Sequence, residues 1–306
     1  MKIRDFAYKT CKKIGIEILS SRLRSLPPGP TPPALWQGLR DLSRDTSILG
    51  RIRTYRTRSG LVIRGDVQDV VTRELFLQGD WEPEIRSLMN ALLRPGDVML
   101  DIGANIGWHT LTAARIVGEK GRCYAFEPVP SVRSFLEENL RLNKVTHCEV
   151  RAEALCDRNG RATMQVVKSH TGISSMLPGD TPADYAVEVA SARLDDLLSF
   201  DRSVNLIKID VEGAEFSVLA GMERLLARDH PDLIIEIGDA RLRKAGSSAV
   251  SLCQHLATLG YRMYPFQADQ DGGGLLPATT DPAMLPETFD ALFTTRASLP
   301  PGVTLL

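Results

Sequence analysis

The segment Asp101-Ile102-Gly103-Ala104-Asn105-Ile106-Gly107 lies between an apolar stretch, Asp97–Leu100, and a helical pattern that starts near Trp108. A glycine turn between a strand and a helix is how an open α/β sheet binds a nucleotide. A pyrophosphate loop offers bare backbone N–H groups, whereas this turn begins with a carboxylate, Asp101, and carries an amide, Asn105, at its centre. A carboxylate repels a pyrophosphate, at a cost on the order of several kcal/mol, but attracts an ammonium or a sulfonium. The turn therefore favours S-adenosylmethionine over a nicotinamide dinucleotide.

Two further acids follow the next two apolar stretches. Glu127 lies about 20 residues after the glycine turn, where a carboxylate can accept hydrogen bonds from both ribose hydroxyls. Nicotinamide enzymes share this feature, so Glu127 identifies the cofactor only together with Asp101 and Asn105. Glu153 could bind the adenine amino group, or it could be an ordinary exposed acid.

The most acidic part of the chain is Ile207–Glu215. Asp210 falls at the tip of the fourth strand, beside the first strand in a doubly wound order, and should face the reacting centre. The next strand carries Glu236 in the same way. Glu215 lies near a helix N-terminus, where the helix dipole stabilises a negative charge, and we assign it that capping role.

Methylation of a hydroxyl needs a base, which contributes roughly 10²–10⁴-fold in rate. The candidates are Asp210, Glu236 and His170, which lies in the loop Ser169–Ser175. His109 is more typical of a packed or ligand-lining side chain. Asp210 and Glu236 could instead hold Mg²⁺, which would lower the pKa of the hydroxyl, but two carboxylates are a minimal ligand set and a metal is not favoured.

Strand and helix patterns alternate from residue 97 onward, as a parallel sheet with crossover helices requires. The predicted strands are 97–101, 121–126, 147–151, 204–210, 232–237, 260–266 and 291–295, and the predicted helices are 82–93, 107–117, 130–143, 214–227 and 247–259. The fold class is therefore α/β, with a doubly wound, mostly parallel, seven-stranded sheet. The interval 155–192 is too long for a simple crossover and predicts a hairpin, 162–167 with 186–191, around a substrate loop.

The chain before this sheet divides into three parts. Residues 1–26 combine apolar residues at helical spacing with many Lys and Arg, which predicts a basic amphipathic helix. This helix could contact an anionic membrane surface, or it could pack on this chain or a second copy, and we favour packing. Residues 27–50 are predicted to form a Pro-rich linker with a short helix. Residues 51–78 are predicted to form a small strand-containing extension with a hairpin, 51–57 with 61–64. The main domain is expected over 79–306.

Composition excludes several classes of protein. The chain has 306 residues and a net charge of -1, so it has no excess of Lys and Arg to neutralise nucleic-acid phosphates. Its five scattered cysteines form no C-x-x-C pair, which disfavours a disulfide framework or a zinc site. Charged residues interrupt the N-terminal apolar pattern, and no apolar run reaches the length of a membrane span. We expect a cytoplasmic protein that acts on a small-molecule or glycan acceptor, and a homo-oligomer stays open.

Several blocks, in this order, resemble the FkbM-like methyltransferases, which are class I S-adenosylmethionine-dependent enzymes with a Rossmann-like sheet. The blocks are Gly79-Asp80-Trp81-Glu82-Pro83, the turn 101–107, Phe126-Glu127-Pro128, Ala154–Asp157, Leu194–Leu197, and Ile207–Glu215 with Val218–Gly221. The resemblance extends over roughly residues 75 to 295 and does not include the N-terminal helix or linker.

The resemblance implies O-methylation of a hydroxyl in a carbohydrate, a glycan or a natural product. It assigns cofactor binding to Asp101, Gly103, Asn105, Gly107 and Glu127, and adds Glu82 and Asp210. Two other classes remain as alternatives: a nicotinamide-dependent oxidoreductase, and a non-catalytic protein that binds S-adenosylmethionine or serves as a scaffold.

Overall fold

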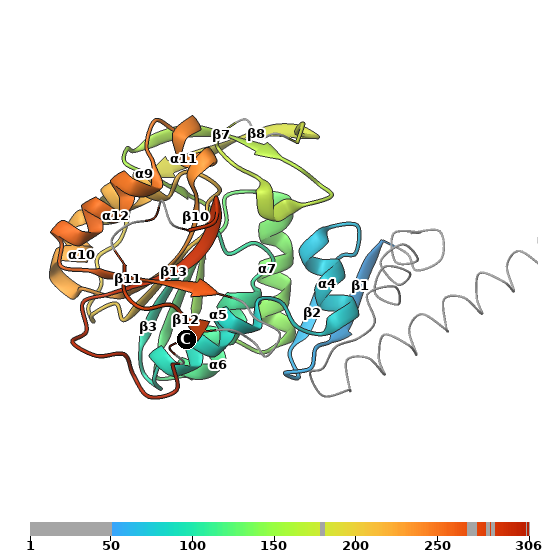
Figure 1. The fold of residues 1–306 in the computed structure, drawn as a ribbon. Coiled ribbons are helices and arrows are strands. Elements are labelled where there is room, and N and C mark those ends of the chain that lie inside the picture. Colours follow the sequence, from blue (N-terminus) through green and yellow to red (C-terminus); the bar gives the residue numbers. More distant parts are fainter. Residues whose placement is uncertain are drawn as a thin grey trace, which may run out of the picture. The chain divides into compact units, whose positions relative to one another are not determined.

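The computed structural model describes residues 51–177, 181–267, 274–279, 282, 285–303 and 305, which form two compact units (Figure 1). The first unit contains the described residues 51–81 together with 168–172, and the second contains those of 82–167 and from 173 onward. The amphipathic helix predicted over 1–26 and the linker over 27–50 lie outside the described residues.

In the described part of the first unit, a β-hairpin is followed by a helix. Strands β1 (Ile52–Arg56) and β2 (Val62–Asp66) pair antiparallel, so the predicted hairpin is confirmed. Helix α4 (Val70–Gln78) is absent from the predicted helices. It begins where the Asp69 side chain accepts a hydrogen bond from the backbone N–H of Thr72, and this N-cap favours a helix over a further strand.

The second unit is built on an eight-stranded sheet with the order β12-β11-β13-β10-β9-β3-β4-β5. Strands β3, β4, β5, β9 and β10 run parallel, and β13 is inserted antiparallel between β10 and β11. This confirms the predicted α/β class. The sheet has eight strands instead of the seven predicted, and the additional strand is β12, a two-residue segment at the edge. The strands are β3 (Val98–Ile102), β4 (Arg122–Phe126), β5 (Cys148–Arg151), β9 (Leu206–Ile209), β10 (Asp232–Gly238), β11 (Arg262–Gln267), β12 (Gly274–Leu275) and β13 (Thr288–Thr294).

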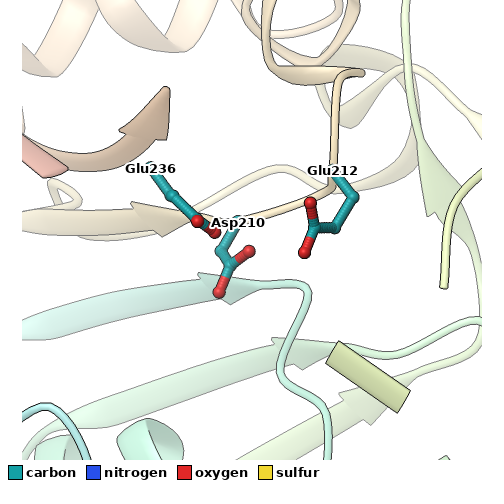
Figure 2. A group of neighbouring side chains, drawn as sticks. All are labelled: Asp210, Glu212 and Glu236. Carbon is teal, nitrogen blue, oxygen red and sulfur yellow. The ribbon is translucent and has the colours of Figure 1, made fainter. Parts of the chain in front are cut away.

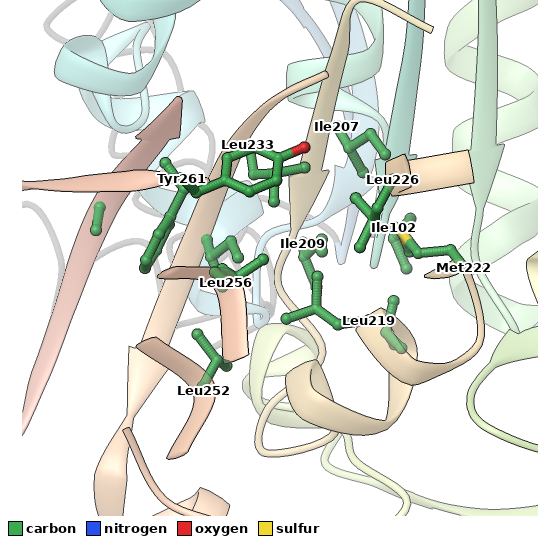
Figure 3. Packing of buried hydrophobic residues seen from close by; sticks show 14 of the residues in the cluster. Ile102, Ile207, Ile209, Leu219, Met222, Leu226, Leu233, Leu252, Leu256 and Tyr261 are labelled. Carbon is green, nitrogen blue, oxygen red and sulfur yellow. The ribbon is translucent and has the colours of Figure 1, made fainter. Parts of the chain in front are cut away.

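Each face of this sheet has its own apolar core. On one face Ile102, Ile207 and Ile209 pack with Leu219, Leu226 and Leu252 from three helices, as Figure 3 shows. On the other face two helices, α5 and α6, cover an apolar cluster around Met99 and Ile234. Among the described residues no helix is long and apolar enough to cross a membrane. The helices are α5 (Pro83–Leu92), α6 (Trp108–Val117), α7 (Pro130–Leu142), α8 (Leu194–Leu197), α9 (Glu215–Ala220), α10 (Glu223–Asp229), α11 (Asp239–Lys244) and α12 (Ala249–Thr258).

The continuous helix predicted over 214–227 is wrong, because the chain breaks there into α9 and α10. The break occurs at Gly221, where a Cβ atom would lie 2.1 Å from the backbone oxygen of Cys156. Only a residue without a side chain allows the two backbones to come this close. The sequence pattern contains no sign of this contact, since Cys156 is distant along the chain.

A three-stranded sheet stands apart from the main one and contains the predicted insertion. Its strands are β6 (Ala154–Leu155), β7 (Gly160–Val166) and β8 (Tyr185–Ala192), in the order β6-β8-β7. The pairing of β7 with β8 confirms the predicted hairpin. A short 3-10 helix, Thr171–Ile173, lies between them in sequence.

The core under α12 provides a test of the fold. Leu252 is fully buried, whereas Val250 on the same helix is 38% exposed. Leu252→Ala should lower the free energy of unfolding by about 2–5 kcal/mol, because a cavity remains in a well-packed core. Val250→Ala should change it by less than about 0.5 kcal/mol. Urea unfolding followed by circular dichroism measures both, and equal losses would contradict the packing described.

Candidate active site

The loop between β3 and α6 comes very close to the end of β9. Gly103 has a φ of +86°, and a Cβ atom there would lie 1.8 Å from the backbone oxygen of Asp210. Asn105 is also left-handed, with a φ of 50°, and Gly107 directly precedes α6. Gly103 therefore serves the path of the backbone, which only glycine can follow here.

The Asp101 side chain is buried near the end of β3 and only partly satisfied. Its Oδ2 atom accepts a hydrogen bond from the Thr110 hydroxyl at 2.5 Å. Among the described residues its Oδ1 atom has no hydrogen-bond partner. An unsatisfied buried acceptor costs about 1–3 kcal/mol, and more when it is charged. This oxygen is therefore suited to receive a hydrogen bond from a ligand such as an ammonium.

Glu127, one residue after β4, binds the same loop from the other side. Its Oε2 atom accepts a hydrogen bond from the backbone N–H of Asn105 at 3.0 Å, and its Oε1 atom accepts one from Val129 at 2.9 Å. Burial raises the pKa of Glu127 to about 7, although both N–H donors act to lower it. Each carboxylate oxygen can accept more than one hydrogen bond, so Glu127 can still bind hydroxyl groups.

Glu153 lies just after β5 and forms a two-pronged ion pair with Arg151. The distances are 3.0 Å from Nη2 to Oε1 and 3.2 Å from Nε to Oε2. Glu153 is partly buried, with 21% of its side chain exposed. Its role in adenine binding stays a prediction.

On one face of the sheet, the side chains are apolar in the middle of the strands and charged at the carboxyl edge. Side chains alternate along a strand, so Asp101 shares a face with Met99, and Lys208 shares it with Leu206. Lys208 is the register partner of Asp101 in the neighbouring strand. The carboxyl-edge cluster consists of Asp101, Lys208, Asp210, Glu236 and Asp290 from the sheet, with Glu82 and His109 from the covering helices.

Lys208 is the buried cation of this cluster. Its Nζ atom donates a hydrogen bond to Oδ2 of Asp210 at 2.8 Å. Burial acts to lower the pKa of Lys208, but the negative charges of Asp210, Asp101 and Glu82 outweigh it and hold the pKa above its usual value. The Lys208 side chain is 6% exposed, whereas that of Asp210 is 26% exposed. Asp210 is therefore the member of the pair that a substrate can reach.

Asp210 and Glu236 differ in protonation. Burial opposes ionisation of Asp210, but Lys208 and a hydrogen bond from Glu236 keep the pKa of Asp210 below its usual value. The charge of Asp210, followed by burial, raises the pKa of Glu236 well above its usual value. Burial, followed by the charge of Glu82, raises the pKa of Asp290 to about 7. At neutral pH Asp210 is therefore a carboxylate and Glu236 a protonated acid.

Glu82 and His109 form a pair between the two covering helices. Glu82 precedes α5 in a left-handed conformation with a φ of 45°, and its Oε2 atom lies 2.8 Å from Nε2 of His109. Burial acts to raise the pKa of Glu82, but the hydrogen bond and charge of His109 lower it overall. In the described residues Nδ1 of His109 is buried without a hydrogen-bond partner. A left-handed glutamate is strained backbone, which is concentrated at functional sites.

Three carboxylates lie close enough together to be considered as ligands for a divalent metal ion. Oxygen atoms of Asp210, Glu212 and Glu236 lie within 4.8 Å of one another (Figure 2). However, Lys208 binds Asp210, Arg241 forms an ion pair with Glu212, and the Arg241 guanidinium also lies 3.9 Å from Glu236. Metal ligands must be free to coordinate, whereas each of these carboxylates already faces a cation of the protein, so this set does not fit a divalent ion.

His170 belongs to the first unit, in the segment 168–172. There the backbone N–H and the hydroxyl of Thr171 both donate to Oδ1 of Asp69, at 2.7 Å and 2.8 Å, and the N–H of Val70 donates to the oxygen of Ser169. The first unit therefore determines where this segment lies. A role for His170 as the base stays a prediction.

Sequence reasoning missed two members of the cluster, Lys208 and Asp290. A signal for Lys208 exists, because Lys208 and Asp210 alternate with Ile207 and Ile209 and so share one face of the strand. Asp290 lies in β13, and the strand predicted over 291–295 starts one residue too late to include it. Since β13 is antiparallel, its beginning lies at the edge where the parallel strands end.

The glycine loop provides a matched pair of variants. Gly103 and Gly96 are both left-handed, but a Cβ atom at Gly96 would meet nothing within 4 Å. Both Gly→Ala changes should cost about 1–2 kcal/mol for the conformation. Gly103→Ala should cost an additional ~1–3 kcal/mol because the new methyl collides with the Asp210 backbone. Urea unfolding of the two variants measures the difference, and similar losses would contradict the close approach.

Comparison with known proteins identifies the family of this chain. A family model described as the methyltransferase FkbM domain matches residues 101–263. The 2-O-methyltransferase NoeI of Sinorhizobium fredii is 29% identical over 164 residues, which cover 47% of this chain and 64% of NoeI. The 31-O-demethyl-FK506 methyltransferase FkbM of Streptomyces tacrolimicus is 31% identical over 162 residues, covering 43% of this chain and 61% of that protein.

A third relative is the hexuronic acid methyltransferase AglP of Haloferax volcanii, 30% identical over 172 residues, which cover 55% of this chain and 67% of AglP. The chain thus spans slightly less than two thirds of the length of NoeI and of FkbM. The family model nevertheless matches more than half of the chain and begins at Asp101 itself. As its sequence blocks predict, the chain belongs to the FkbM family of S-adenosylmethionine-dependent methyltransferases.

Proposed function

We propose that this chain transfers a methyl group from S-adenosylmethionine to a hydroxyl group of a carbohydrate or another natural product. The observation that carries the proposal is the carboxyl-edge cluster, which places an ionised, partly exposed Asp210 beside the glycine loop. Family membership supports the proposal over a nicotinamide oxidoreductase. The acidic edge supports it as well, because carboxylates attract a sulfonium and an ammonium and repel a pyrophosphate.

The residues that would hold the cofactor surround the loop 103–107. The unpaired Oδ1 atom of Asp101 would accept a hydrogen bond from the ammonium of the methionine part, and Glu82 would add negative charge nearby. Glu127 would accept hydrogen bonds from the ribose hydroxyls, and Glu153 is assigned to the adenine. Gly103 and Gly107 would allow the loop backbone to pass close to the ligand, although the N–H groups of Gly103, Asn105 and Gly107 already donate hydrogen bonds within the protein.

A hydroxyl acceptor is supported by the names of the relatives. NoeI is a 2-O-methyltransferase, FkbM acts on 31-O-demethyl-FK506, and AglP is named for a hexuronic acid. These names cover both a carbohydrate and a natural product, so the acceptor class is proposed at that level. A small-molecule or glycan partner, rather than nucleic acid, agrees with the acidic site.

Proton transfer is the task of the protein's own side chains. When bound, S-adenosylmethionine supplies a methyl group on a sulfonium, and its S–C bond breaks as the acceptor's O–C bond forms. Aligning two reactants contributes about 7–11 kcal/mol. The hydroxyl proton must also leave, and Asp210 is suited to accept it because it is ionised and 26% exposed. Glu236 is protonated and would keep Asp210 oriented through their shared hydrogen bond.

Replacing the base should separate catalysis from cofactor binding. We expect Asp210→Asn to lower kcat by roughly 10²–10⁴-fold, the usual contribution of a general base, while the protein still binds S-adenosylhomocysteine. The measurement is transfer of a labelled methyl group into a panel of sugars and hydroxylated natural products, with calorimetry for binding. A wild-type protein that binds the product but methylates nothing in the panel would favour the non-catalytic alternative. Binding of NAD without S-adenosylhomocysteine would overturn the proposal.

The pKa of Glu127 predicts how cofactor affinity depends on pH. Because burial raises this pKa to about 7, Glu127 is ionised at pH 8 and mostly protonated at pH 6. A protonated carboxyl is a weaker acceptor for ribose hydroxyls, so the affinity for S-adenosylhomocysteine should fall by up to roughly tenfold from pH 8 to pH 6. Glu127→Gln should bind more weakly at pH 8 and lose most of this pH dependence. Calorimetry at four pH values checks it, and an equal slope in the variant would assign the effect to another group.

A further inference from the structure

The ammonium of Lys208 lies among the acids of the carboxyl-edge cluster and is almost completely buried. Its Nζ atom is 2.8 Å from Asp210, and the charges of Asp101 and Glu82 act on it as well. Its register partner on the other side, in β10, is the apolar Ile234. Two residues further along β10, on the same face, lies Glu236, so acids from both neighbouring strands surround the ammonium at the carboxyl edge.

The groups that face Lys208 and Asp210 come from several elements. They are Asp101 from β3, Glu82 before α5, His109 from α6, Glu215 from α9, Glu236 from β10 and Asp290 from β13. Carboxylates this close to one another repel, and the protein can relieve the repulsion by a cation or by protonation. Both occur here: Glu236 holds a proton, and Asp210 holds the ammonium of Lys208.

We propose that Lys208 is a positioning residue that supplies, from within the protein, the positive charge for which these acids would otherwise require a bound metal ion, and that it thereby fixes the Asp210 carboxylate for methyl transfer. The part that concerns methyl transfer rests on the proposed function.

The chemistry of the donor set favours a lysine over a metal. Mg²⁺ requires near-octahedral oxygen ligands at about 2.0–2.1 Å and usually one or two ionised carboxylates. Here Arg241 forms an ion pair with Glu212 and lies 3.9 Å from Glu236, and Lys208 binds Asp210. An ammonium needs no such geometry, because it has three donors that rotate about one bond. Lys208 therefore neutralises Asp210 without covering the face of the carboxylate that is exposed.

The test compares Lys208→Met, which keeps the length but removes the charge, with Lys208→Arg, which keeps the charge. Lys120→Met is the matched control, since Lys120 is exposed after α6 and outside the cluster. We expect Lys208→Met to lower kcat at neutral pH by about 100-fold or more, the scale of a lost general base. The KM for S-adenosylmethionine should change by less than about threefold, because the edge stays negative. Lys208→Arg should recover part of the rate, and Lys120→Met should match the wild type.

The pH profile separates positioning from a merely structural role. Without the ammonium, Asp210 takes up a proton more readily, so the acid limb of kcat should move to higher pH in Lys208→Met but not in Lys208→Arg. A destabilised protein would lose activity at every pH with the limb in place. That result would overturn the inference, and so would a rate unchanged by Lys208→Met. A wild-type rate abolished by a chelator and restored by Mg²⁺ would overturn it as well.

A measurement without turnover keeps the inference independent of the proposed function. Aspartate labelled with ¹³C at the carboxyl group can be titrated by NMR in the full chain, with Asp210→Asn to assign the signal. The Asp210 signal should titrate at higher pH in Lys208→Met than in the wild type. If the Asp210 signal titrates at the same pH in both proteins, Lys208 does not lower the pKa of Asp210, and the inference is refuted even if the enzyme is active. Conversely, if the wild type transfers no methyl group, the proposed function is refuted, but the titration of Asp210 still tests the effect of Lys208 on its pKa.

If circular dichroism shows that Lys208→Met does not fold, Lys208→Arg is titrated instead. A shifted Asp210 signal in that variant would count against the inference.

Discussion

The ion pair between Lys208 and Asp210 is the interaction on which the carboxyl edge of the sheet depends. An isolated buried ion costs several kcal/mol, and removing one partner of a buried pair costs about 3–5 kcal/mol because the other charge is left uncompensated. Lys208 avoids this cost through Asp210, and Asp210 remains an anion among other acids because of Lys208. Neither residue suits this environment without the other.

The two faces of the sheet divide stability and chemistry between them. In β9, Ile207 and Ile209 point into one core, while Leu206 and Lys208 point to the opposite face. The same alternation applies to β10, where Glu236 follows Ile234 on the polar side. One face is therefore apolar along the strand, and the other changes from apolar to charged toward its end. This arrangement lets the sheet carry a charged cluster without interrupting the larger core.

Features that depend on residues close together in the sequence could be predicted, whereas features that depend on contacts between distant residues could not. The parallel strands and most helices depend on local patterns of apolar residues, and they lie within a few residues of their predicted bounds. The break at Gly221 depends on its contact with the Cys156 backbone, and the start of α4 depends on a single hydrogen bond from Thr72 to Asp69. Neither feature produces a periodic pattern of apolar residues in the sequence. Site residues at strand ends were predictable because parallel strands end at one edge. Asp290 was not, because it enters that edge from an antiparallel strand.

The charge balance of the cluster explains why a cationic ligand suits it even though a lysine is already present. Glu236 is protonated and Asp290 is shifted toward the neutral form, so neither contributes a full negative charge. Glu82 is held as an anion by His109, and Asp210 by Lys208. The Asp101 oxygen that lacks a hydrogen-bond partner in the described residues then marks the place where a further donor is needed. A second lysine there would complete the neutralisation permanently, whereas an ammonium on a ligand completes it only when the ligand is bound. The incomplete neutralisation of the edge thus becomes a source of affinity for a sulfonium nucleoside with a free amino group.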